Sequence, residues 1–174
     1  MKFPSHTVCT ALATPLGPMT LAATPTALVG AWFDGQQHQP SLGAWLEDPE
    51  HPLLRAAGQQ LLEYFAGRRQ QFDLPLDLSG GTAFQQAVWT RLRGIASGST
   101  LSYGHISQQI QNPAAVRAVG AAVGRNPISV IVPCHRVLGA NGALTGYAGG
   151  LDRKIALLQL ERNLLSLIHI SEPT

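Results

Sequence analysis

The stretch "AVRAVGAAVGRNPISVIVPCHRV", residues 115–137, determines how the rest of the chain is interpreted. Its first part, "AVRAVGAAVG", has the small side chains of a closely packed helix and one charge, Arg117. The apolar run "ISVIV" follows and leads to Cys134 and His135. Such a pair is either a buried thiol beside a hydrogen-bonded histidine or a nucleophile beside its base. Adjacency alone favours the buried pair, so the decision depends on the surrounding sequence.

The segment that leads into this stretch has the outline of a helix-turn-helix. "LSYGHISQQIQ", residues 101–111, predicts a short helix, and the Asn112-Pro113 pair then predicts a turn. Asparagine caps helices well and proline fits the first helical position, so a second helix is expected to open at this pair. Two short helices joined by a tight turn are typical of DNA-binding helix-turn-helix units.

Two interpretations of the second helix remain open. It can be a buried helix from which Arg117 extends to solvent. It can also be a helix that approaches another surface closely and keeps one cation free. A helix that reads bases in the major groove usually carries several Asn, Gln or Arg side chains, and this helix has too few. Small side chains fit contact by shape in a narrow minor groove, with little sequence specificity.

Outside this region the sequence changes from strands to helices. Three short runs, residues 7–14, 19–24 and 27–33, are separated by turn-forming residues and predict a three-stranded meander. A helix is predicted from Pro52 to Ala66, followed by Gly67. Its apolar stripe consists of Leu53, Leu54, Ala57, Leu61, Leu62 and Phe65.

The second half is predicted to be mainly helical. Thr82 is suited to cap a helix over residues 83–95, and a last helix is expected from Leu151 to about Glu161. A short apolar strand is expected after Pro127. We therefore predict an N-terminal domain over residues 1–80 and a C-terminal domain over 81–165. Residues 166–174 depart from the local helical pattern and are expected to be a non-native or disordered tail.

Composition narrows the class of protein. The chain has 174 residues and is 45% hydrophobic, which suits one ordinary domain or two small ones and excludes a disordered protein. The net charge of +2 permits an anionic partner without requiring one. Two cysteines, Cys9 and Cys134, are too few for a disulfide framework or an all-cysteine zinc site. No run approaches the roughly 18 apolar residues of a membrane span, and no signal peptide is evident, so a cytoplasmic protein is expected.

Activation of Cys134 as a nucleophile requires a base and a group that orients the base. His135 is the nearest candidate base, although neighbours in a loop need a bridging water if their side chains do not touch. Glu161, in the last predicted helix, is a plausible orienting carboxylate, because an acceptor on one ring nitrogen fixes the tautomer of a histidine. A purely structural Glu161 that pairs with Arg162 or Lys154 is the alternative.

The motifs together resemble the O6-alkylguanine-DNA alkyltransferases, most closely the bacterial constitutive form. The blocks "YGHIS", "AVRAVGAAVGRNPISVIVPCHRV", "GYAGGLDRK" and "LLQLE" carry the resemblance, which is dense from Gly81 to Glu161. It is looser in the N-terminal half, over "TPLGPMTL" and "LLEYFAGRR". The resemblance implies an α+β fold, with a small N-terminal antiparallel sheet and helix of ribonuclease H-like type. A helical C-terminal domain with the helix-turn-helix would follow.

The resemblance also implies a role for individual residues. The alkyl acceptor falls on Cys134, its water-bridged base on His135 and the carboxylate that orients the base on Glu161. The catalytic set is completed by Tyr103, which acts on the 3′ phosphate and as a proton donor, and by Asn126, the hinge before the active-site loop. The implied DNA-binding residues are Arg117, which would take the place of a flipped nucleotide, and Tyr103, Ala118, Gly120 and Ala121. The implied substrate-binding residues are Tyr147, Ala148, Gly149 and Val123.

Two of these positions depart from the family pattern. Ala148 stands where some members have a serine that hydrogen-bonds the modified oxygen, so that contact would have to come from the backbone. Val123 occupies a position that is often larger, which predicts a roomier pocket. The N-terminal metal-binding residues of some animal members are not evident, so no structural zinc and no cofactor are expected.

The implied activity is that of a methylated-DNA–[protein]-cysteine S-methyltransferase. Such a protein flips an O6-alkylguanine out of double-stranded DNA through the minor groove and transfers the alkyl group irreversibly to its own cysteine. A monomer that acts once in the cytoplasm, at the nucleoid, is expected, with no membrane partner. A non-enzymatic reader of alkylated DNA is the main alternative, although such relatives replace the cysteine that is present here as Cys134. A cysteine hydrolase is a third possibility. Preference among alkyl groups and activity on O4-alkylthymine stay open.

Overall fold

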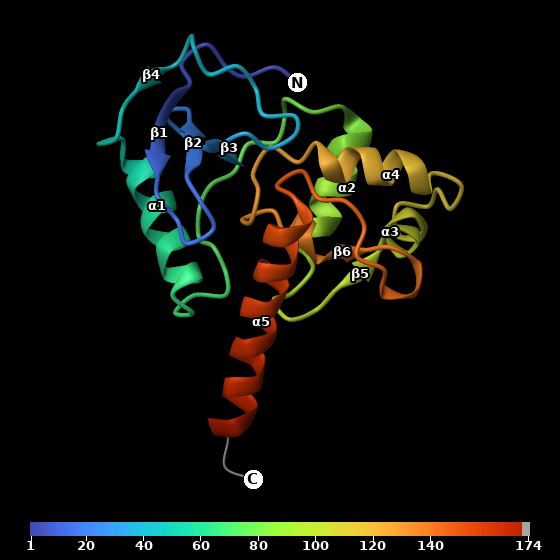
Figure 1. The fold of residues 1–174 in the computed structure, drawn as a ribbon. Coiled ribbons are helices and arrows are strands. Elements are labelled where there is room, and N and C mark those ends of the chain that lie inside the picture. Colours follow the sequence, from blue (N-terminus) through green and yellow to red (C-terminus); the bar gives the residue numbers. More distant parts are fainter. Residues whose placement is uncertain (172–174) are drawn as a thin grey trace.

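The computed structural model describes the backbone of residues 1–171 and the side chains of residues 1–163. A sheet and helix α1 (Pro52–Phe65) form one side of the molecule, and the helices α2 to α4 form the other (Figure 1). Helix α5 (Leu151–Ser171) begins between the two sides. No helix within the described residues is both long and apolar enough to cross a membrane.

The N-terminal sheet has the order β3-β2-β1-β4. Strands β1 (Val8–Leu12), β2 (Met19–Ala23) and β3 (Leu28–Phe33) pair antiparallel and confirm the predicted meander. The two-residue strand β4 (Leu46–Glu47) pairs with β1 in parallel, so the sheet is mixed and the expectation of a purely antiparallel sheet is wrong in this respect. The long connection after β3 allows the chain to return in the parallel direction.

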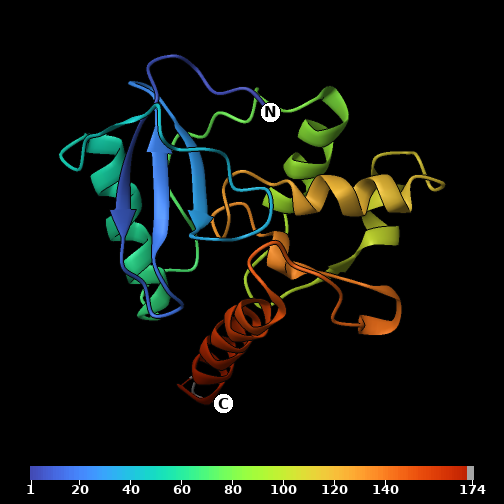
Figure 2. The same ribbon diagram turned by 45° about the horizontal axis from the view of Figure 1, so that its top comes forward.

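Both faces of this sheet are covered. Helix α1 lies along one face (Figure 2), where Leu54, Ala57 and Leu61 join the main core. On the other face the Trp32 ring stacks on Trp45 with a centroid distance of 5.9 Å. Every residue of β2 is therefore buried, which explains its nearly continuous apolar sequence.

Helix α1 begins where the sequence predicts, and most of its predicted apolar stripe is buried or packs against the core, with a shift toward Tyr64. His51 precedes Pro52, and the His51 ring nitrogen accepts a hydrogen bond from the backbone N–H of Leu53. Leu62 was expected in the buried stripe and is 43% exposed, whereas Tyr64 is fully buried. The buried stripe of this helix is rotated because the Tyr64 hydroxyl finds a buried partner in the C-terminal half.

The C-terminal half contains the expected helix-turn-helix, with one boundary corrected. Helix α2 (Ala83–Arg93) has the capping box of Thr82, and α3 (Tyr103–Gln109) follows the short strand β5 (Leu101–Ser102). Helix α4 (Val116–Gly124) begins three residues after Pro113 and has no side-chain cap, so the predicted start at Asn112-Pro113 is wrong. The backbone carbonyl of Asn112 instead accepts from Ser107 Oγ and from the N–H of Ala115, which holds residues 112–115 as a turn.

The apolar run after Pro127 is not the regular strand that we predicted. Ala31 of β3 exchanges backbone hydrogen bonds with Pro127 and Ser129, and the chain then turns tightly at Val130. Val130 has φ of 72°, a left-handed conformation that a β-branched residue rarely adopts and that marks local strain. The one bridge to β3 joins the C-terminal half to the N-terminal sheet just before Cys134.

The remaining elements lead from the cysteine to the last helix. A 3-10 turn η1 (Cys134–Arg136) runs into β6 (Val137–Leu138), which pairs in parallel with β5, and a second turn η2 (Ala140–Gly142) follows. Helix α5 begins at Leu151 as predicted but continues to Ser171, so the expected end near Glu161 is wrong. Residues 166–171 continue this helix, and the expectation of a non-native or disordered tail over residues 166–174 stays a prediction. The rest of the predicted tail, residues 172–174, lies outside the described part.

Candidate active site

Cys134 lies at the wall of a cavity of about 460 Å³. Its side chain is buried, at 4% exposure, yet it lines the cavity together with residues from α3, α4 and the loop before α5. Two residues of the β3–β4 connection complete the wall, so both halves of the chain form it. The lining residues are Gln37, His38, Tyr103, Val116, Gly120, Ala121, Val123, Gly124, Cys134, Thr145, Gly146, Tyr147 and Ala148.

The buried side chain of Asn126 holds the loop that carries Cys134. The Asn126 carbonyl oxygen accepts from the backbone N–H of Ile128 at 3.0 Å, and its amide donates to the carbonyl of Val132 at 2.7 Å. These bonds close residues 126–132 into one compact turn, and the N–H of Cys134 then donates to the same Val132 carbonyl at 2.8 Å. A shorter or apolar side chain at Asn126 would leave the buried N–H of Ile128 without a partner and would remove the bond that ties residue 126 to the Val132 carbonyl.

Behind Cys134, a buried carboxylate collects four hydrogen bonds. Glu161 Oε2 lies 2.8 Å from His135 Nε2, 2.8 Å from Arg136 Nη2 and 2.6 Å from the Tyr64 hydroxyl. Glu161 Oε1 accepts from Arg136 Nε at 2.9 Å, and Arg136 Nη1 donates to the carbonyl of Ile95 at 2.6 Å. The alternative pairing of Glu161 with Arg162 or Lys154 is not formed, because the carboxylate points inward to this cluster.

Electrostatics determine the tautomer of His135. Burial opposes the charge on Glu161, but the hydrogen bonds and charges of His135 and Arg136 hold the pKa of the carboxyl well below its ordinary range. Burial lowers the pKa of His135 below its ordinary value, although Glu161 acts in the opposite direction. At neutral pH a neutral imidazole therefore donates its Nε2–H to the carboxylate. The Nδ1 atom then carries the lone pair, and it has no hydrogen-bond partner among the described residues.

The surroundings of Cys134 have opposing effects on the ionisation of its thiol. Burial raises the pKa of the Cys134 thiol, while the Asn126 amide, the Lys154 ammonium and the Tyr147 hydroxyl act to lower it. Lys154 is fully buried and donates to the carbonyls of Val137 and Thr145 at 2.6 and 3.0 Å. The thiol is thus mainly protonated at rest, and a nearby base is needed to produce the nucleophile.

The loop before α5 closes one side of the cavity. Its Ala148 carbonyl accepts a hydrogen bond of 3.0 Å from the N–H of Gln37, which links it to the N-terminal half. Gly149 is buried, and a Cβ at this position would lie 2.6 Å from the Tyr147 ring and 3.2 Å from Phe33. A larger residue at Gly149 would therefore displace the ring that lines the cavity.

Helix α4 presents its small residues to solvent. Arg117, Ala118 and Ala121 are exposed, whereas Val119, Ala122 and Val123 face the core. Arg117 forms no hydrogen bond or ion pair with any described residue. The interpretation of α4 as a buried helix is wrong, because one complete face of it borders the cavity and solvent. On that border Gly120 lies against the Tyr103 ring, at 3.9 Å from an added Cβ.

The geometry agrees with the outcome of sequence comparison. A family model described as "6-O-methylguanine DNA methyltransferase, DNA binding domain" matches residues 83–163. A second, described as "6-O-methylguanine DNA methyltransferase, ribonuclease-like domain", matches residues 7–78. The chain belongs to the 6-O-methylguanine DNA methyltransferase family. The expected ribonuclease-like character of the N-terminal half is thereby confirmed.

Relatives of this methyltransferase family match nearly the whole chain. A methylated-DNA–protein-cysteine methyltransferase of Mycobacterium tuberculosis is 51% identical over 149 residues, which are 86% of this chain and 88% of the relative. One of Methanosarcina acetivorans is 49% identical over 148 residues, 84% of this chain and 93% of the relative. The crystal structure of Mycobacterium tuberculosis OGT in complex with DNA superposes with a TM-score of 0.83 at 49% identity and covers 88% of this chain and 92% of that chain.

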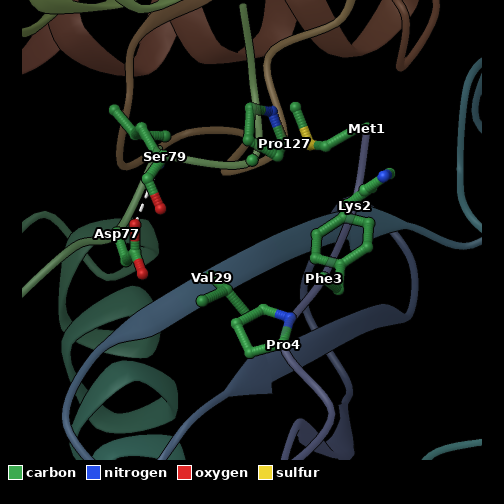
Figure 3. A pocket seen from close by; sticks show the side chains of 10 residues that line it. Met1, Lys2, Phe3, Pro4, Val29, Asp77, Ser79 and Pro127 are labelled. Carbon is green, nitrogen blue, oxygen red and sulfur yellow. Dashed lines mark hydrogen bonds between the residues drawn. The ribbon is translucent and has the colours of Figure 1, made fainter.

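A second cavity, of about 250 Å³, shares no lining residue with the cavity at Cys134. It is formed by the N-terminal residues Met1 to Pro4 against residues 77–80 and Pro127 (Figure 3). Asp77 accepts there from the N–H of Ser79, and no cysteine or histidine lines the space. Within the described residues no group of three His, Cys, Asp or Glu side chains is placed to hold a metal ion.

Several residues of the site were missed from the sequence. Arg136 and Lys154 belong to the quoted motifs "PCHRV" and "GGLDRK", but nothing in the spacing shows which atoms they bind. Tyr64 had one detectable signal, a polar-tipped aromatic residue next to the apolar stripe of α1. Gln37 and His38 line the cavity from a loop far away in sequence, and no local pattern indicates this contact.

Proposed function

We propose that this protein repairs O6-alkylguanine in double-stranded DNA by transferring the alkyl group to Cys134, once per molecule. The observation that carries the proposal is the position of Cys134, on the wall of a cavity that opens beside the exposed small-residue face of α4. The cavity can take a base that has left the duplex, whereas Cys134, at 4% exposure, cannot reach a stacked base. The DNA complex of a similar protein supports the choice of partner.

The proposed mechanism begins with binding through the minor groove. Apart from Val116 and Arg117, the exposed side chains of α4 are alanines, so the helix can approach the narrow groove closely, and Arg117 can occupy the space that the flipped nucleotide leaves. Phosphate contacts supply most of the affinity, which should decrease as salt rises. The flipped base then enters the cavity between Tyr147 and Val123, next to Cys134.

Chemistry in the cavity needs one proton acceptor and one donor. His135 Nδ1 accepts the thiol proton through a bridging water, because Glu161 holds the Nε2–H. The Cys134 sulfur attacks the alkyl carbon in line, the S–C bond forms and the C–O6 bond breaks. Tyr103, which lines the cavity, protonates the leaving guanine and recovers its proton from solvent. The product is a thioether at Cys134, which no group in the site can cleave, so the protein acts once.

The alternatives make different demands on the site. A non-enzymatic lesion reader of the same fold does not need the buried His135–Glu161 pair behind an intact Cys134. A cysteine hydrolase requires repeated turnover on esters. A monomeric state and action in the cytoplasm at the nucleoid stay predictions.

The experiment that tests the proposed function is intact-mass spectrometry after incubation with duplex DNA that contains O6-methylguanine. The mass should increase by one methyl group per chain and then stop. Peptide mapping should locate the group on the peptide with Cys134. If the DNA lost its methyl groups in repeated turnovers while the mass of the protein stayed unchanged, single-turnover transfer would be contradicted.

The rate of transfer is expected to fall as the pH is lowered. Since burial lowers the pKa of His135 below 6.5, the inflection of the rate profile should lie below that pH, because protonation removes the base there.

Folding stability should also decrease as the pH is lowered. The lowered pKa of His135 contributes stability that is complete above pH 6.5 and is lost as the pH falls, and Glu161 adds to the loss at still lower pH. Single-turnover rates with free O6-benzylguanine and thermal melts from pH 5 to 8 (roughly the titration range of histidine) measure both. A rate that stays constant over this range, or one that His135→Asn does not alter, would contradict the role of the base.

Replacing Arg117 with alanine should slow repair of duplex DNA and leave the reaction with free O6-benzylguanine nearly unchanged. If the side chain offsets lost stacking, the duplex defect should be about 1–3 kcal/mol, of the order of the cost of extruding a base. Binding to undamaged duplex should hardly change. The matched control is Arg125→Ala, which removes the same charge just after the end of the same helix. Equal slowing on duplex and free base would show that Arg117 supports the cavity.

A further inference from the structure

Tyr64 is a buried polar residue that the proposed chemistry does not use. It lies in α1 of the N-terminal half, 97 positions before Glu161, and its side chain is fully buried. Its hydroxyl donates to Glu161 Oε2 at 2.6 Å. The Tyr64 ring packs against Phe65 and Phe72, with centroid distances of 5.3 and 5.6 Å. The hydroxyl is therefore held in place by the packing of its own domain.

We propose that Tyr64 is a positioning residue for His135. It links the N-terminal domain to the catalytic base through Glu161. The proposal rests on the proposed function, because it concerns the base for the reaction of Cys134. It does not require Tyr64 to touch DNA or the alkylated base. The hydroxyl acts on the oxygen that holds the imidazole in its reactive tautomer.

The argument depends on which oxygen is shared. Oε2 of Glu161 accepts from His135, Arg136 and Tyr64, whereas among the described side chains Oε1 accepts from Arg136 alone. Each donor on Oε2 withdraws negative charge that would otherwise stabilise a protonated His135. The Tyr64 hydroxyl thus keeps the carboxylate from holding a proton on the imidazole, and it fixes the plane of the carboxylate so that Nε2 stays aligned.

Among the groups near His135, the Tyr64 hydroxyl is the one that can be removed without changing a charge. The charged groups that act on the imidazole are Glu161 and Lys154 from α5 and Arg136 from η1, and the Tyr64 hydroxyl from α1 shares Glu161 Oε2 with it. Arg136 is bound to Glu161 by two hydrogen bonds and Lys154 to two carbonyls, so both charges are fixed. Burial and the charge of Glu161 raise the pKa of Tyr64 far above its ordinary value, so it remains a donor at all relevant pH.

The test is the pH profile of alkyl transfer in Tyr64→Phe, measured as single-turnover rates with free O6-benzylguanine. Removal of the hydroxyl should make Glu161 a stronger partner for protonated His135. The acid limb of the profile should therefore move to higher pH by about half a unit or more. Phenylalanine retains the ring and its packing, and Oε2 keeps two donors, so the variant should fold. An acid limb that coincides with that of the wild type would overturn the proposal.

Two further measurements separate positioning from simple stability. Leu54→Ala removes a buried core side chain from the same helix and no hydrogen bond to Glu161, so it should lower the melting temperature and leave the pH profile in place. In the wild-type protein, the Tyr64 hydroxyl proton should give a protected NMR resonance that shifts as His135 titrates. If the chemical shift of this proton did not change as His135 titrates, the proposal would be overturned, even if Tyr64→Phe failed to fold. Failure of the wild type to gain an alkyl group would instead contradict the proposed function.

Discussion

Replacing Cys134 with alanine is expected to abolish alkyl transfer while the fold and DNA binding are retained. The thiol is the acceptor in the proposed reaction, and Cys134 is the one cysteine among the described residues that line the cavity. The substitution removes one sulfur atom from a cavity wall and no described hydrogen bond of the side chain, so the free energy of unfolding should change by about 1 kcal/mol or less. The measurement is the intact mass after incubation with O6-methylguanine DNA, together with a binding titration on the same duplex.

The second cysteine provides a matched control for this experiment. Cys9 lies in β1 at 7% exposure. Burial, and to a smaller extent the nearby charge of Glu47, raises the pKa of its thiol. It is therefore a poor nucleophile, and Cys9→Ala should gain one methyl group as the wild type does. Transfer to Cys9, or transfer that persists in Cys134→Ala, would refute the assignment of the acceptor.

Much of the fold could be predicted because its signals are local. Thr82 and Gln85 form the capping box that starts α2, and the turns around Gly17 and from Thr24 to Ala27 separate the strands of the meander. The predictions were wrong where a contact with a distant part of the chain determines the local structure. The short strand β4 needs β1 as a partner, and the bridge at Ala31 replaces the strand that was predicted after Pro127. No periodicity within a segment reveals such contacts.

The same distinction applies to the site. Residues within the motif around Cys134 could be proposed from the resemblance, and the structure brings His135 and Glu161 together at 2.8 Å. The partners that hold them, Arg136 and Tyr64, could not be predicted, because a carboxylate in a helix can face several cations. The tertiary arrangement that brings Tyr64 of α1 and residues of η1 to Glu161 of α5 determines which donors the carboxylate meets.

Replacing Glu161 with glutamine should have the largest effect on stability and should also slow transfer. The substitution leaves the positive charge of Arg136, which is 6% exposed, without its carboxylate partner. Loss of one member of a buried ion pair typically costs about 3–5 kcal/mol, a large share of the stability of a small protein. The new amide also places N–H donors opposite other donors. Denaturant unfolding measures the first effect, and single-turnover rates with free O6-benzylguanine measure the second.

A double variant separates the two roles of this carboxylate. Arg136→Met in addition to Glu161→Gln removes the unpaired charge, so part of the lost stability should return, as expected for neighbours that are not additive. The transfer rate should stay low, by about 10²-fold or more, because nothing then holds His135 in the tautomer that leaves Nδ1 free to accept a proton. If the rate recovered along with the stability, Glu161 would serve the fold alone, and the base would not need an orienting group. If neither recovered, the loss would come from the mismatched amide and not from the charge of Arg136.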